Sequence, residues 1–137
     1  ILLGYPITNK KHIFQLCEKI ALGANVTFMV DSLEQVELIQ EQAMKFDIKA
    51  PICIDIDMSS KFPFIYFGVY RSSIKNIHDF KKFIQQIKNF QNIAIHGIMG
   101  YEAQIAGIAE RRARGAQIGP LLHALLELTA QKCRIPY

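Results

Sequence analysis

The sequence predicts an α/β fold, a partial TIM-type (β/α) barrel with about four parallel strands and a helical tail. Four apolar segments alternate with segments of helical periodicity, as in βα units. The apolar segments are hydrophobic on both sides, which is typical of parallel strands covered on both faces. The chain has 137 residues, whereas a complete (β/α)8 barrel needs about 200 to 250. We therefore expect one incomplete barrel, and a piece of something longer, because Ile1 already stands inside a strand.

Each predicted strand ends in polar or aromatic side chains. The strands cover residues 1–6, 25–32, 51–59 and 92–104. Tyr5, Asp31, Asp57 and Tyr101 stand at their ends, and Arg71 follows the third strand. In parallel α/β folds the chemistry lies at the carboxyl-terminal ends of the strands. We therefore expect these five residues on one rim.

Asp55 is the exception within the strands. A carboxylate inside an apolar strand costs several kcal/mol unless it is paired. Either Asp55 binds a partner in the interior, or its strand ends earlier than residue 59.

Three amphipathic helices connect the strands. Asn9, Ser32 and Asn76 stand at their predicted N-caps, and Gln35 completes a capping box with Ser32. Gly23 ends the first helix. The predicted buried faces are Ile13, Leu16, Cys17 and Ile20 in the first helix, Val36, Ile39, Ala43 and Phe46 in the second, and Ile77, Phe80, Ile84 and Ile87 in the third. One-sided apolar faces suit helices on the outside of a barrel or sheet.

The last part of the chain has a different pattern. Residues 1–107 form the predicted barrel domain, and residues 108–137 form a helical tail of unknown role. A leucine-rich helix is predicted from Pro120. It would cover exposed sheet or contact another subunit, so a homo-oligomer is one expectation.

Composition narrows the possible functions. The net charge of +4 permits an anionic ligand but does not demand nucleic acid. No apolar stretch is long enough to span a bilayer and no signal peptide is visible, so we expect no membrane partner and a cytoplasmic location. Cys17, Cys53 and Cys133 form no CxxC pair and are expected as free thiols. No histidine has a second ligand at helical spacing, so we expect no metal site.

A set of motifs resembles a known family. The third strand gives I-D-I-D-M-S from Ile54, followed by G-V-Y-R-S from Gly68, and the fourth gives H-G-I-M-G-Y-E from His96. In order and spacing these resemble the pyridoxal-phosphate barrel of the alanine racemase-like group (fold type III). The D-threonine aldolase and D-serine dehydratase branch is the most similar. The opening ILLGYP is similar to the preceding strand in that branch.

The resemblance implies two cofactor contacts, Arg71 and Tyr101. Arg71 matches the arginine near the phenolic oxygen of pyridoxal 5′-phosphate, where a fixed cation favours the oxyanion. Tyr101 matches the residue whose ring packs on the pyridine plane. The alternatives are a surface arginine after a turn and a loop aromatic on the rim.

Several family features are not recognisable in this sequence, among them the phosphate-binding loops and the C-terminal β-domain, which the resemblance places downstream. The G-H step of the pattern is Ala103 and Gln104 here. The family's Schiff-base lysine lies on the first barrel strand, which we expect upstream of Ile1. The lysines of this chain are predicted on helices or loops, with none in a strand. No catalytic residue is therefore assigned.

The leading hypothesis is part of a pyridoxal-phosphate-dependent enzyme that acts on a small D-amino or β-hydroxy amino acid, as a D-threonine aldolase-like lyase or a racemase. The alternative is a catalytically inactive truncated paralogue that serves as a binding or assembly unit. An unrelated α/β ligand-binding domain would explain the strand ends but not the ordered motifs. Whether the chain is an enzyme by itself stays open, because it lacks the lysine.

Overall fold

The computed structural model describes residues 1–62 and 65–101. The chain divides into two compact units, which are described one at a time. The first consists of Ile1–Asp57 and Arg71–Gly100, and the second of Met58–Tyr70 and Tyr101–Tyr137. The predicted tail over 108–137 lies outside the described residues, so the domain division at residue 107 stays a prediction.

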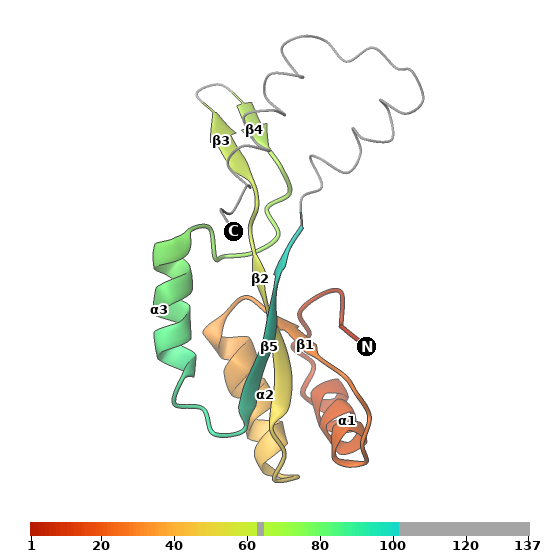
Figure 1. Ribbon diagram of the computed structural model, residues 1–137. Coiled ribbons are helices and arrows are strands. Elements are labelled where there is room, and N and C mark those ends of the chain that lie inside the picture. The colour runs from red at the N-terminus through yellow and green to blue at the C-terminus, as the bar shows by residue number, and fades with distance from the viewer. Residues whose placement is uncertain (63–64, 102–137) are drawn as a thin grey trace, which may run out of the picture. The chain divides into compact units, whose positions relative to one another are not determined.

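The first unit contains an open parallel sheet, which confirms the predicted fold class. Its strands are β1 (Phe28–Val30), β2 (Ala50–Ile56) and β5 (Ile93–Gly100), in the spatial order β1-β2-β5 (Figure 1). Both pairings are parallel. The predicted first strand is reduced to a parallel bridge between Leu2 and Thr27, beside β1. The four apolar segments therefore lie in chain order, as in a partial TIM-type barrel, but the strands are shorter than predicted.

Three helices follow the predicted positions: α1 (Lys10–Ala21), α2 (Leu33–Met44) and α3 (Ile77–Ile87). They form one layer, in which α2 contacts both α1 and α3 and packs on β2 (Figure 1). The Asn9 side chain accepts hydrogen bonds from the N–H groups of Lys11 and His12, and that of Asn76 accepts one from Asp79 N–H. Gly23 follows α1 with φ +93°, a conformation that glycine adopts without strain.

The core lies between the helices and one face of the sheet. Alternate strand residues point into it, because successive side chains of a strand face opposite sides. The buried apolar residues of this cluster are Ile13, Cys17, Phe28, Val30, Val36, Ile39, Ala43, Ala50, Ile52, Ile54, Ile74, Phe83 and Ile87. Among the described residues, none of the helices is long and apolar enough to cross a membrane.

Two predictions about the helices are wrong in detail. Ile77 was expected on the buried face of α3, but it is 67% exposed at the first helical position, whereas Phe83 is 5% exposed. Packing begins one turn into the helix, and the stripe that meets the core is Phe80, Phe83, Ile84 and Ile87. The predicted capping box is also absent. Ser32 occupies the N-cap without a side-chain capping bond, and the Gln35 carboxamide binds Asp31 instead.

The second unit contains a hairpin that the sequence did not predict. Strands β3 (Ser60–Phe62) and β4 (Ile65–Phe67) pair antiparallel. Lys61 lies in β3, so the prediction that no lysine stands in a strand is wrong, although this strand is not part of the parallel sheet. Gly68 directly follows β4 with φ +130°, and a Cβ there would stand 2.7 Å from Ser59 Cα. Only glycine fits this close approach.

Candidate functional site

Arg71 is held from three directions at the carboxyl-terminal end of the parallel sheet. Its Nε donates to Asp55 Oδ2 at 2.9 Å, and its Nη2 donates to the carbonyl oxygen of Gly4 at 2.7 Å. The guanidinium carbon lies 4.9 Å from the centroid of the Tyr5 ring. The Arg71 side chain is only 16% exposed. Arg71 is therefore not the solvated surface arginine of the alternative interpretation, because two edges and one face of its planar group have protein partners.

The sequence left open whether Asp55 is paired inside the fold or whether its strand ends before it, and the structure shows that it is paired. The strand β2 continues past it to Ile56, and its side chain is 0% exposed and paired with Arg71. Its other oxygen, Oδ1, is buried without a hydrogen-bond partner among the described residues. A buried carboxylate with one satisfied oxygen depends strongly on its single cation. The ion pair therefore fixes the Arg71 guanidinium against the buried Asp55 side chain.

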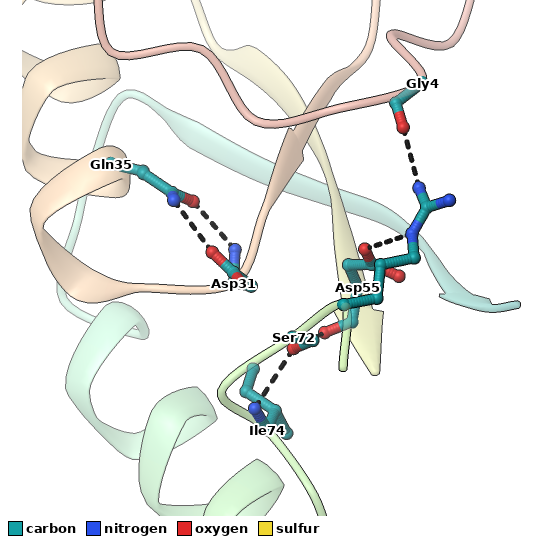
Figure 2. A network of polar contacts seen from close by, with 7 residues as sticks. Gly4, Asp31, Gln35, Asp55, Ser72 and Ile74 are labelled. Carbon is teal, nitrogen blue, oxygen red and sulfur yellow. Dashed lines mark hydrogen bonds and ion pairs between the residues drawn. The ribbon is translucent and has the colours of Figure 1, made fainter. Parts of the chain in front are cut away.

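The segment Arg71–Ile74 ties the strand ends together. Ser72 Oγ donates to the carbonyl oxygen of Asp55 at 2.6 Å and accepts from Ile74 N at 3.0 Å, and Figure 2 shows these three residues in one chain of hydrogen bonds. Asp57 N donates to the carbonyl oxygen of Ile74 at 2.9 Å. The segment thereby pairs with the end of β2, and Ile74 enters the core.

The rim prediction holds for the residues of the first unit. The structure places Asp31 directly after β1 and Asp57 directly after β2, while Arg71 contacts both Gly4 and Tyr5. Tyr101 follows β5 and is 47% exposed, but it belongs to the second unit. That Arg71 and Tyr101 share one ligand therefore stays a prediction.

The chemistry at Arg71 suits an oxygen anion more than a positively charged group. A guanidinium is a planar donor that binds oxyanions with defined direction. Asp55 offsets its net charge, so Arg71 supplies a directed hydrogen-bond donor rather than an isolated cation. The phenolic oxygen of pyridoxal 5′-phosphate is one group that would fit such a donor.

The two cysteines in the described part of the chain are poor nucleophiles. Cys17 and Cys53 are buried and free, as predicted; Cys133 lies outside the described residues. Burial raises the pKa of the Cys17 thiol from 9.0 to about 11. Burial, and then the charge of Asp55, raise the pKa of Cys53. Both thiols are protonated at neutral pH, and a thiol is a weak nucleophile. Within the described ranges, no three His, Cys, Asp or Glu residues are grouped to hold a metal ion.

Sequence reasoning missed the contacts that attach the segment after Arg71 to the strand ends. Ser72 binds the carbonyl oxygen of Asp55 in β2, Ser73 binds that of Asp31 directly after β1, and Gln35 binds Asp31. The available signal was the pair of serines after Arg71, since short hydroxyl side chains in loops often bind nearby backbone groups. For Gln35, the local capping signal pointed to Ser32 instead.

Comparison with known proteins gives one family. The family model described as "Alanine racemase, N-terminal domain" matches residues 6–137, which is nearly the whole chain. Among curated proteins, none matches this chain. The family model spans β1, β2, β5 and the Arg71 segment, the same elements that form the candidate site. The chain therefore belongs to the alanine racemase N-terminal domain family.

Proposed function

We propose that the chain is part of a pyridoxal-phosphate-dependent enzyme of the D-threonine aldolase and D-serine dehydratase branch. Its substrate would be a small D-amino or β-hydroxy amino acid. The family is generally dependent on this cofactor. The observation that carries the proposal is the orientation of Arg71 by Asp55, Gly4 and Tyr5. A guanidinium fixed in this way loses little further conformational entropy when it binds an anion.

Each site residue has one role in the proposal. Arg71 donates a hydrogen bond to the phenolic oxygen of the cofactor and favours its ionised form. Tyr101 supplies an aromatic surface for the pyridine ring. When bound, pyridoxal 5′-phosphate supplies an electron sink for the bond broken at the substrate α-carbon. The chain itself binds and orients; the choice among retro-aldol cleavage, dehydration and racemisation depends on residues beyond those assigned here.

Non-covalent binding tests the proposal. Pyridoxine 5′-phosphate keeps the phenolic oxygen but has no aldehyde, so it cannot react with surface lysines. We expect pyridoxine 5′-phosphate to bind the full chain saturably, as measured by the change in the fluorescence of the ligand. Arg71→Lys should weaken binding at least tenfold, because a charge-assisted hydrogen bond is worth about 1.5–3 kcal/mol. The control is Lys82→Gln on the exposed face of α3, which should change nothing. Equal affinity in Arg71→Lys and the unaltered chain would contradict the assignment.

We expect no catalysis by this chain alone. Pyridoxal 5′-phosphate followed by borohydride should label no unique lysine, and D-threonine and D-serine should not turn over. No lysine lies in the parallel strands that the structure describes. In the family that the sequence resembles, the lysine that forms the Schiff base with the cofactor stands in the first strand of the barrel. Stoichiometric labelling of one lysine with turnover would contradict this expectation.

The second candidate is an inactive binding or assembly unit. It is favoured by exposed apolar residues on β5: Ile95 is 48% and Ile98 is 56% exposed. β5 is an edge strand of the described sheet, and such edges promote association. This candidate predicts a concentration-dependent oligomer by light scattering that Ile98→Lys disrupts, with no binding of pyridoxine 5′-phosphate. Binding that requires Arg71 favours the first candidate.

A further inference from the structure

A second set of contacts links helix α2 to the segment that follows Arg71. Asp31 follows β1, and Gln35 lies in the first turn of α2. Asp31 N donates to Gln35 Oε1 at 2.8 Å, and Gln35 Nε2 donates to Asp31 Oδ1 at 2.7 Å. Figure 2 shows these two side chains facing each other. The carboxamide thus fixes both the main chain and the carboxylate of Asp31.

Asp31 in turn holds the segment that carries Arg71. Ser73 Oγ donates to the carbonyl oxygen of Asp31 at 2.6 Å. Ser72 binds the carbonyl oxygen of Asp55 on the neighbouring strand. The segment after Arg71 is therefore attached to the ends of both β1 and β2, and the attachment to β1 passes through Asp31.

The Gln35 contact is not a standard helix cap. In a capping box, the side chain at this position would bind the N–H of the N-cap residue, Ser32. Here it binds the residue before the N-cap. A carboxamide has both a donor and an acceptor, so it pairs with the N–H and the carboxylate of Asp31 together. The result restrains the β1–α2 loop, where Ser73 is attached, rather than the helix end alone.

We propose that Gln35 is a positioning residue for Arg71, acting through Asp31 and Ser73. By fixing the carbonyl of Asp31, it limits the motion of the Arg71 segment and keeps the guanidinium in the orientation that binds an oxyanion. The consequence for cofactor affinity rests on the proposed function. The restraint on Arg71 itself does not, so the two are measured separately.

The chain offers a matched control on the same helix. Gln40 also forms a reciprocal pair: its Nε2 lies 3.4 Å from Asn92 Oδ1, and Asn92 N donates to its Oε1 at 3.0 Å. Asn92 directly precedes β5, so this pair lies at the amino-terminal end of the sheet. Gln40→Met removes the same kind of contact as Gln35→Met, but at the end opposite to Arg71.

The test compares Gln35→Met, Ser73→Ala, Ser73→Thr and Gln40→Met in the full chain. The first readout is hydrogen exchange of the Arg71 Nε–H, measured by ¹⁵N NMR. We expect exchange to be severalfold faster in Gln35→Met and Ser73→Ala, and unchanged in Gln40→Met and Ser73→Thr, which keeps the hydroxyl. The second readout is the dissociation constant for pyridoxine 5′-phosphate, which should rise three- to tenfold in the first two variants only.

The outcomes separate the two ideas. Equal exchange rates of the Arg71 Nε–H in Gln35→Met and Gln40→Met would overturn the positioning role. Both changes would then act on Arg71 only by lowering the stability of the whole fold. If Gln35→Met does not fold, Ser73→Ala against Ser73→Thr decides, and equal exchange in that pair overturns the role. Faster exchange in a chain that binds no pyridoxine 5′-phosphate supports the positioning role and contradicts the proposed function.

Discussion

Replacing Arg71 by methionine should be among the most destabilising single changes in the described structure. Asp55 is 0% exposed, and its Oδ1 already lacks a hydrogen-bond partner among the described residues. Without Arg71 Nε, its buried charge loses the cation that offsets desolvation, which costs about 3–5 kcal/mol. The Gly4 carbonyl also loses its donor, but that group is exposed and can bind water at little cost.

The double variant Asp55→Leu with Arg71→Met isolates the charge effect. It replaces the pair by apolar side chains, so its free energy of unfolding should fall within about 2 kcal/mol of the unaltered chain. The assay is urea denaturation followed by far-UV circular dichroism, with equal m values as the check for comparable unfolding.

A surface ion pair provides the control. Lys10 Nζ lies 3.0 Å from Glu41 Oε2, but the side chains are 62% and 49% exposed. Lys10→Met should cost under about 1 kcal/mol. If Arg71→Met costs no more than Lys10→Met, or if the two single changes at Asp55 and Arg71 simply add, then the carboxylate is stabilised in another way and the reasoning is refuted.

Three further predictions follow from other parts of the structure. Burial raises the pKa of Cys17 from 9.0 to about 11, so the thiol loses its proton at lower pH in the unfolded chain than in the folded one. The free energy of unfolding should therefore fall between pH 9 and pH 11, by about 1.4 kcal/mol per pH unit at most. Cys17→Ala should lack this decrease. Gly68→Ala places a Cβ 2.7 Å from Ser59 Cα, so amide exchange in the β3–β4 hairpin should accelerate while β1, β2 and β5 keep their protection; an unchanged hairpin would contradict the close approach. Phe83→Ala should cost about 3–4 kcal/mol and Ile77→Ala under about 1 kcal/mol in urea titrations, because only Phe83 is buried; equal costs would contradict the assigned face of α3.

Much of the fold was predictable because its signals are local. Asn9 and Asn76 cap helices as expected, and the buried stripe of α2 follows its spacing of three and four residues. The sequence also predicted a partner for Asp55, because burying an unpaired carboxylate in an apolar strand costs several kcal/mol of stability. Arg71 itself came from a family resemblance and not from any local pattern.

The remaining features depend on tertiary contacts. Gln35 has a choice between the N–H of Ser32 and two groups of Asp31, and only the folded loop decides it. The predicted buried face of α3 included Ile77, but helix periodicity does not say at which turn packing begins. The hairpin β3–β4 was hidden because short apolar runs fit several kinds of structure.

The hydrogen bond between Asp57 N and the carbonyl oxygen of Ile74 has a consequence for how this chain tolerates change. The main chain leaves the parallel sheet at Asp57 and returns at Arg71, and this bond joins the two sides of that excursion. The contacts of Arg71 with Asp55 and Gly4 involve no residue between 58 and 70. The bond uses main-chain groups alone, so side-chain substitutions at Asp57 and Ile74 keep its donor and its acceptor, and only Asp57→Pro removes the donor.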